Sequence, residues 1–187
     1  MAELPTDEEL SIDWNFRWML VSLARRCSTL RETQGHNRSP EIDQINAFMG
    51  LPKGSAYCLS GLYVKVIQEL CNHMEIYNPL PKTGSTQKFW EKVPDKYKRL
   101  PGTKAKKGDI FVLRNRKYPS SGHVGLLTED ETNVMKTAEF NTNINGSSEG
   151  EGFHELSRTQ HGTLSQEYLG SVDIVSWIID ENPGLNE

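Results

Sequence analysis

Hydrophobic residues recur at steps of three and four near the start of the chain, a spacing typical of an amphipathic helix. The apolar positions are Trp14, Trp18, Leu20, Val21, Leu23 and Ala24. We expect this helix to end near Arg31. Tryptophans in such a stripe usually pack into the protein core rather than form a partner-binding face. We therefore expect both Trp14 and Trp18 in the core.

Two further helices are predicted before residue 75. Ser39 and Pro40 suit the N-cap and the first position of a helix. The expected inner face of this helix is Ile42, Ile45, Phe48 and Met49. The next helix runs from about Tyr57 to His73 and has apolar residues at helical spacing.

The second half of the chain has the pattern of strands. Residues 78–108 are rich in proline and read as loops, with one short helix at about residues 85–92. After Gly108, short apolar or alternating runs are separated by turn-forming residues. These runs are residues 109–113, 123–127, 134–140, 152–156 and 172–179. Helices followed by strands predict an α+β fold, with helices packed on an antiparallel sheet of about five strands.

The length of 187 residues suits one domain. We expect an N-terminal extension at 1–10, a single domain at 11–180 and a C-terminal tail at 181–187. The apolar runs are far shorter than the ~20 residues that cross a bilayer, so no membrane span is expected. The acidic N-terminus lacks the basic and apolar regions of a signal peptide, which predicts synthesis in the cytoplasm and export by a route other than Sec.

The charge balance argues against a nucleic-acid partner. The formal net charge is −4, so no global basic field exists to hold a polyanion. The basic residues between Lys96 and Lys107 could contact an anionic wall polymer or a nucleic acid, but a solvated loop is the commoner role of such a run.

Three cysteines without a CxxC pair favour neither disulfides nor a thiolate metal site. Cys58 falls at the first turn of the predicted third helix, where the helix dipole and free backbone N–H groups favour a thiolate. The same N–H groups could hold an oxyanion. Position alone leaves open that Cys58 is a small buried apolar residue. Cys27 and Cys71 lie among apolar neighbours, and we expect both to be inert.

A base and an orienting group follow in the strand region. His123 opens a predicted strand after Gly122, where it could serve a thiol as its base, although a surface loop histidine is the commoner case. Glu139 and Asn141 are two residues apart and would share one face of a strand, where either could fix the histidine tautomer. A solvated strand end is the alternative. The four other histidines, His36, His73, His154 and His161, lie in polar segments or at a helix end.

Zinc binding is the alternative role for Cys58, His123 and Glu139. Structural zinc sites favour closely spaced ligand pairs, and catalytic ones usually contain two or three histidines. Neither pattern is present, so we assign no metal and no cofactor.

Taken together, these segments resemble the CHAP family of cysteine, histidine-dependent amidohydrolases and peptidases, which is related to the NlpC-type wall peptidases and has a papain-like fold. The matching segments are Gly54–Cys58, Gly108–Val112, Gly122–Gly125 and Glu139–Asn143, with further similarity at Asn37–Ile42 and Gly146–Phe153. The spacing is 65 residues from Cys58 to His123 and 16 from His123 to Glu139. The sequence departs from the family where Tyr57 replaces the more usual Trp or Gln, and where Phe140 replaces a common Gly.

The resemblance implies a role for each matching residue. Cys58 corresponds to the nucleophile, His123 to the general base, Glu139 to the residue that orients the histidine and Asn141 to an additional polar residue of the site. It implies cleavage of an amide bond of peptidoglycan, by an amidase or an endopeptidase, after release as a phage-type lysin or injection as an antibacterial toxin. A toxin would be expected to have an immunity protein that covers Cys58. A non-catalytic wall-binding protein of the same fold and a thiol acyltransferase are the alternatives.

Overall fold

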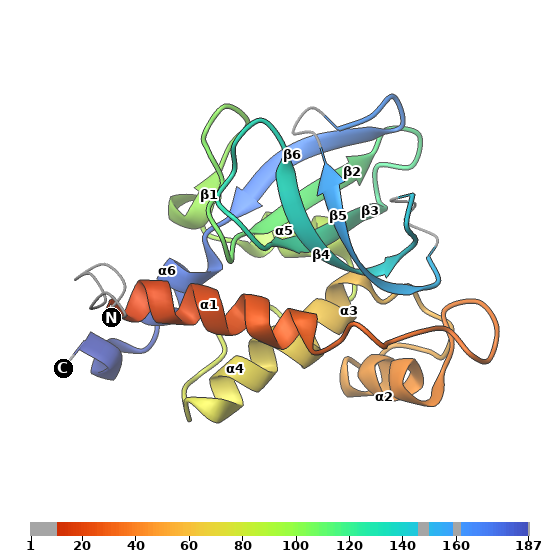
Figure 1. The fold of residues 1–187 in the computed structure, drawn as a ribbon, viewed down its shortest axis with the longest axis horizontal. Helices are drawn as coiled ribbons and strands as arrows, with labels where there is room; N and C mark the ends of the chain where they lie inside the picture. The colour runs from red at the N-terminus through yellow and green to blue at the C-terminus, as the bar shows by residue number, and fades with distance from the viewer. Residues whose placement is uncertain (1–10, 146–149, 159–161, 187) are drawn as a thin grey trace, which may run out of the picture.

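A computed structural model describes residues 11–145, 150–158 and 162–186, and Figure 1 shows its helices packed against one twisted sheet. The N-terminal half is mostly helical. Its elements are α1 (Ile12–Arg25), α2 (Pro40–Phe48), α3 (Cys58–Leu62), the π-helical η1 (Tyr63–Ile67), α4 (Gln68–His73), α5 (Thr86–Lys92) and the 3-10 turn η2 (Asp95–Tyr97). The strands and last helices are β1 (Lys98–Arg99), β2 (Ile110–Asn115), β3 (Gly122–Leu127), β4 (Met135–Thr142), β5 (Gly152–Arg158), β6 (Gln166–Val172), α6 (Ile174–Asp180) and η3 (Pro183–Asn186).

The predicted α+β class is confirmed. The six strands form one sheet in the order β1-β6-β2-β3-β4-β5, and every neighbouring pair is antiparallel. The sheet has one strand more than the five expected, because the two-residue β1 pairs with the end of β6. Four of the expected strands correspond to β2, β3, β4 and β5.

The prediction of a strand at residues 172–179 is wrong. The strand β6 lies earlier and ends at Val172, and the following apolar run forms α6. Asp173 caps this helix by accepting a hydrogen bond from the Ser176 backbone N–H at 3.3 Å. Val175 and Ile178 are both completely buried one helical turn apart. Periodicity does not separate a short buried strand from a short buried helix, so the apolar run alone was ambiguous.

The helix starts follow the local capping signals. Ser39 accepts a hydrogen bond from the Ile42 backbone N–H at 3.1 Å, and Ser85 caps α5 in the same way. The end of the first helix differs from the prediction, because α1 stops at Arg25 rather than near Arg31. Tight turns follow it, and Arg31 then pairs with Gly152 at the edge of β5.

Two aromatic residues expected inside the protein are partly exposed. Trp18 is 41% exposed and packs against Trp14 on the outer side of α1. The buried face of α1 is instead Phe16, Leu20, Val21 and Ala24, with the charged Arg17 among them. Phe48, expected on the inner face of α2, is 46% exposed. Both side chains lie at the edge of the apolar stripe of their helix. The spacing of apolar residues alone does not determine whether a residue at that edge is buried or exposed.

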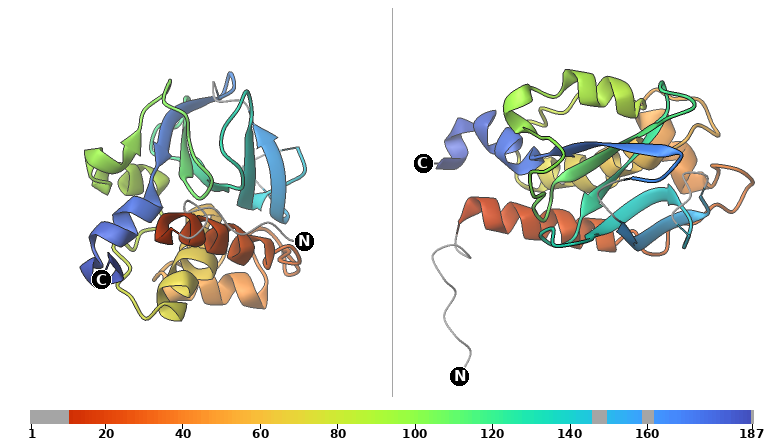
Figure 2. Two further views of the ribbon diagram at one scale, coloured as in Figure 1. Left: turned by 60° about the vertical axis from the view of Figure 1, so that its left-hand side comes forward. Right: turned by 90° about the horizontal axis from the view of Figure 1, so that it is seen from above.

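Two hydrophobic clusters lie on opposite faces of the sheet. The larger one fills the space between the sheet and the helices, which lie below the strands in the left view of Figure 2. The smaller one contains Phe111, Leu113, Leu127, Met135 and Tyr168, together with Ala105 from the loop before β2.

The sheet curls around the smaller cluster. The Arg158 guanidinium of β5 lies 5.8 Å from the ring centre of Phe111 on β2, although β3 and β4 lie between these strands. In a flat sheet, three strand spacings would separate the two backbones by about 14 Å. The curl therefore brings the edge strand β5 back over the inner face of β2 and β3.

A buried ionic network fastens α1 to the sheet. Arg17 contacts Asp109 at 3.0 Å and Asp173 at 2.7 Å, and Arg99 pairs with the same two carboxylates. Arg99 belongs to the basic run expected to form a solvated loop, so that prediction is wrong for this residue. The basic residue Lys107 lies over the ring of Trp18 at 3.8 Å.

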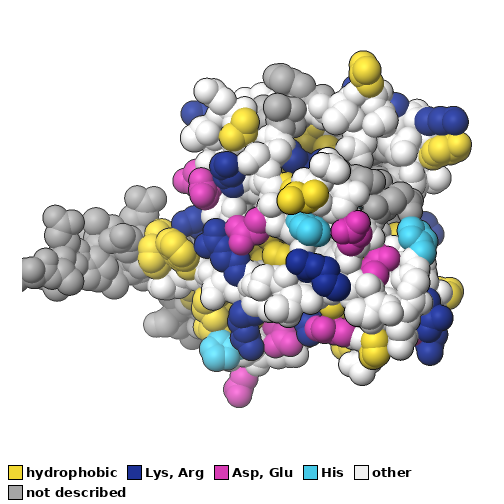
Figure 3. Space-filling view, turned by 45° about the vertical axis from the view of Figure 1, so that its right-hand side comes forward, with side chains coloured by type: hydrophobic (Ala, Val, Ile, Leu, Met, Phe, Trp, Pro, Cys, Tyr) yellow, Lys and Arg dark blue, Asp and Glu magenta, His cyan; other side chains and the backbone are white. Residues whose placement is uncertain are grey.

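Acidic, basic and histidine side chains are interspersed on the face seen in Figure 3, where hydrophobic side chains lie apart from one another. Among the described residues, no helix is long and apolar enough to cross a bilayer.

Candidate active site

Cys58 is the first residue of a helical stretch that continues through α3, η1 and α4 to His73. The preceding Tyr57 supplies no capping side chain to this helix, because its hydroxyl points instead to Glu32 at 3.3 Å. The first N–H groups of the helix therefore lack a side-chain acceptor at Tyr57, and such groups are of the kind that can hold a developing anion. The Cys58 side chain is buried, with 5% of the residue exposed.

The loop before Cys58 is held by two asparagines. Asn46, completely buried in α2, donates to the Ser55 carbonyl at 2.9 Å and accepts from the Ser60 hydroxyl at 2.8 Å. Asn37 donates to the Gly54 carbonyl at 3.2 Å. These contacts anchor the loop at both sides, so the position of the thiol is fixed by α2 as well as by its own helix.

His123 is completely buried as the second residue of β3. Its Nε2 lies 2.8 Å from Oε2 of Glu139 on β4. A small residue is required two positions later, because a Cβ on Gly125 would lie 2.6 Å from Cγ of Glu139. Gly122 is equally constrained, since a Cβ there would lie 2.1 Å from the Leu113 carbonyl oxygen. The motif Gly122–Gly125 thus makes room for the histidine and for its carboxylate partner.

Glu139 accepts four hydrogen bonds. Its Oε1 accepts from the Thr137 hydroxyl at 2.5 Å and from Arg158 Nε at 2.5 Å. Its Oε2 accepts from Arg158 Nη2 at 2.6 Å and lies next to His123 Nε2. An ionised carboxylate has about four acceptor positions and no donor. His123 Nε2 must therefore carry a proton, and Nδ1 is the ring nitrogen that can accept or release one.

The Nδ1 atom of His123 is buried and makes no well-aligned hydrogen bond among the described residues. Cys58 is nevertheless close enough to act on the ring. Burial lowers the pKa of His123, but the Cys58 side chain and Glu139 outweigh it and raise this pKa to about 9. The Cys58 side chain therefore lies within interaction distance of the His123 ring, whose Nε2 is occupied by Glu139.

Burial would raise the pKa of Glu139, but His123 and Arg158 overcome this effect and lower it to about 2. The carboxylate is therefore ionised at neutral pH and favours a protonated histidine. Sequence patterns gave no sign of Thr137 or of Arg158. Thr137 could have been suspected from its position two residues before Glu139 on the same strand face, whereas the contact of Arg158 depends on the register of β4 with β5, which pairs Arg158 with Met135 on that face.

Asn141 is buried near the site, but its expected orientation does not follow from strand alternation. It has a positive φ of 54° in a stretch where the pairing of β4 with β5 shifts between Glu139 and Thr142. Residues two apart share a face only in a regular strand. The participation of Asn141 in the site therefore stays a prediction.

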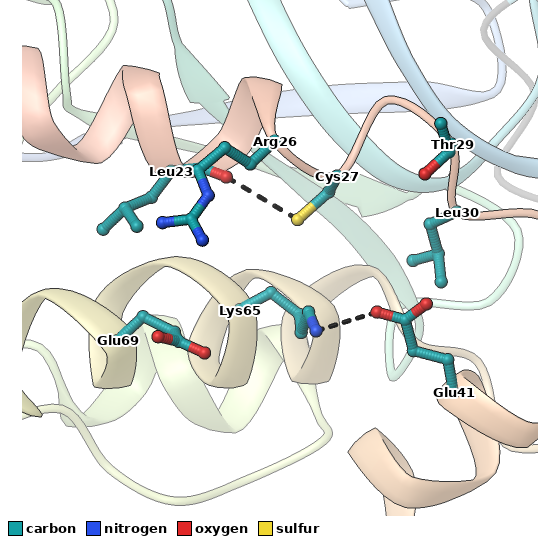
Figure 4. Close-up of a pocket in the computed structure, with 8 residues that line it drawn as sticks. All are labelled: Leu23, Arg26, Cys27, Thr29, Leu30, Glu41, Lys65 and Glu69. Atoms are coloured by element: carbon teal, nitrogen blue, oxygen red, sulfur yellow. Dashed lines mark hydrogen bonds and ion pairs between the residues drawn. The ribbon is translucent and has the colours of Figure 1, made fainter.

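The other two cysteines are buried, as expected. Cys27 lines a cavity of about 130 Å³ between α1 and η1, where its thiol faces the Leu23 carbonyl at 3.6 Å (Figure 4). Burial raises the pKa of Cys27 to about 11 and that of Cys71 to about 12. Both thiols are protonated at neutral pH, which suits the inert role predicted for them.

The remaining described histidines lie in separate elements. His73 ends α4, as expected, and His154 lies in β5, within the strand predicted at 152–156, opposite Glu139 in the strand register. His161 and residues 146–149 of the Gly146–Phe153 segment lie outside the described residues. Among the described residues, no group of three or more His, Cys, Asp or Glu side chains is arranged to hold a metal ion.

No protein-family model and no curated protein sequence matches this chain. The geometry of Cys58, His123 and Glu139 is therefore the basis for assigning a function.

Proposed function

We propose that the protein is a cysteine hydrolase that cleaves an amide bond of peptidoglycan. The observation that carries the chemical part of this proposal is the tautomer of His123. Glu139 holds Nε2, which leaves the buried Nδ1 to exchange a proton with Cys58. This order of thiol, imidazole and carboxylate is the arrangement used by papain-like enzymes.

The Cys58 sulfur would attack the carbonyl carbon of the scissile amide, and the N–H groups at the start of α3 would hold the oxygen that becomes negative. The imidazolium of His123 would then protonate the leaving amine through Nδ1. In the second half of the reaction, His123 would take a proton from water, which attacks the thioester and releases the acid. Glu139 would keep the ring in one tautomer and stabilise its charged form through both steps.

The substrate class rests on a different argument. The segments around Cys58, His123 and Glu139 resemble a family that acts on bacterial cell walls, and the lack of room for a side chain at Gly122 and Gly125 explains why one of these segments needs glycine. Peptidoglycan is therefore the substrate that we propose, either at the muramic acid–L-alanine amide or within its peptides.

The test is digestion of purified sacculi, with the released fragments analysed by mass spectrometry. The wild-type protein should release fragments with new amino and carboxyl ends, whereas Cys58→Ala and His123→Ala should release none. Cys27→Ser is the matched control, since it removes another buried thiol outside the site, and it should keep most of the activity. Circular dichroism should show that all three variants are folded.

Full activity in Cys58→Ala would contradict the mechanism. Binding of sacculi without fragment release by the wild-type protein would indicate a wall-binding function. Transfer of the acyl group to an added amine, in preference to water, would indicate a thiol acyltransferase.

A further inference from the structure

We propose that Arg158 is a positioning residue of this site, which fixes the plane and the charge of Glu139 and thereby holds His123 toward Cys58. This inference rests on the proposed function, and it adds a residue on β5 to a set that otherwise comes from α3, β3 and β4.

The geometry of the contact gives Arg158 a role that Thr137 does not have. Its guanidinium binds one carboxylate oxygen through Nε and the other through Nη2, at 2.5 and 2.6 Å. Two parallel bonds from a planar group fix the plane of the carboxylate. Thr137 offers a single hydroxyl, which also lies 3.5 Å from the Leu156 carbonyl, so it does not fix that plane alone. The direction in which Oε2 meets His123 therefore depends on the guanidinium fork.

The Arg158 side chain is itself well held. It is 12% exposed, and its guanidinium lies 5.8 Å from the ring centre of Phe111, a distance at which a cation is attracted to an aromatic face. Phe111 also approaches His123, with ring centres 6.1 Å apart. One aromatic side chain from β2 thus packs against both the histidine and the arginine that flank Glu139.

The charges around Glu139 explain why a second cation matters. His123 contacts Glu139 from β3, and Arg158 contacts it from β5. His154, also on β5, interacts with Glu139 electrostatically, and Cys58 on α3 interacts with His123. Near His154 lie the charges of Arg31 and Glu151. Without Arg158, the histidine would be the main counter-charge of a completely buried carboxylate. Burial would then favour protonation of Glu139, and a protonated Glu139 would no longer stabilise the imidazolium.

The experiment measures the rate at which iodoacetamide alkylates Cys58 between pH 4 and 10, by mass spectrometry of the peptide that contains it. Arg158→Met removes the charge and the fork, and Arg158→Lys keeps the charge alone. Arg114→Met is the matched control, because it removes an arginine that pairs with Glu167 elsewhere on the same sheet. Cys27 and Cys71 serve as internal references in every sample.

In Arg158→Met, the pKa of Glu139 should rise by about 1 to 3 units, because the opposite charge beside it is lost. The acid-side midpoint of the Cys58 alkylation profile should move up with it, because Glu139 then supports the imidazolium of His123 only at higher pH. Arg158→Lys should keep a midpoint closer to the wild type. In Arg158→Lys, kcat for the release of fragments from sacculi should nevertheless fall about ten- to a hundredfold, because His123 is less well placed. Arg114→Met should behave as the wild type in both assays.

The outcomes separate this inference from the function that it extends. A folded Arg158→Met with the wild-type profile overturns the role of Arg158 and leaves the Cys58–His123 chemistry intact. If Arg158→Met does not fold, wild-type kcat and profile in Arg158→Lys overturn the role equally. A wild-type protein in which Cys58 reacts no faster than Cys27 at pH 7 overturns the proposed function, and this inference with it.

Discussion

At the scale of residues, the chemistry depends on how His123 is charged. A completely buried imidazole is normally neutral, because burial lowers its pKa. Here Glu139 and Cys58 reverse that effect and raise the pKa of His123 to about 9. The histidine is therefore protonated at neutral pH, as the proposed mechanism requires of the group that donates a proton to the leaving amine.

This shift predicts how stability depends on pH. The pKa of His123 rises from 6.5 when unfolded to about 9 when folded, so the folded state binds the proton more tightly. The resulting stabilisation is fully present below about pH 6.5 and is lost as the pH rises toward 9. The free energy of unfolding, measured with denaturant from pH 6 to 10, should fall over this interval in the wild-type protein.

The comparison that isolates His123 uses His123→Gln, which keeps a polar side chain of similar size. Its free energy of unfolding should fall less between pH 6.5 and 9, so the two curves should converge as the pH rises. Curves that stay parallel across this interval would contradict the raised pKa.

At the scale of elements, the attachment of α1 depends on Arg17. This side chain is buried and meets Asp109 at the start of β2 and Asp173 at the cap of α6. Asp109 is completely buried and pairs with both Arg17 and Arg99. Its role in the structure is to connect three elements.

We expect Arg17→Ala to destabilise the protein by about 3–5 kcal/mol, because it removes one of the two guanidinium groups that neutralise Asp109 and Asp173 and leaves Arg99 to pair with both. Arg25→Ala is the matched control on the same helix. Arg25 pairs with Glu155, but both side chains are nearly half exposed, so its loss should cost at most about 1 kcal/mol. Denaturant unfolding of the two variants at pH 7 measures the difference, and equal losses would contradict the structural role given to Arg17.

The difference between local and distant contacts explains which elements could be predicted from the sequence. Ser39 and Ser85 mark helix starts because a cap contacts N–H groups only three residues away. The start of the third helix at Cys58 was predictable for a similar reason, from the turn residues before it. The run at 172–179 was not, because its apolar residues fit a buried strand and a buried helix equally well.

At the scale of the whole molecule, the central residues of the site could be predicted and their support could not. Cys58, His123 and Glu139 were recognisable from their order and local surroundings, and the fold places the last two in contact. Arg158 and Arg99 had no such signal. The first reaches Glu139 because β5 pairs with β4 in a register that places Arg158 opposite Met135, and the second reaches Asp109 because the loop before β2 folds back. Contacts of this kind are set by the tertiary structure.

The account has one central claim, that the Cys58 thiol and the His123 ring interact inside the folded protein. The most direct measurement is an NMR titration of the His123 ring in the wild-type protein and in Cys58→Ala. The account predicts a pKa well above 6.5 in the wild type and a lower value in Cys58→Ala, because the variant lacks the Cys58 side chain that helps to raise it. The same pKa in both proteins would contradict it.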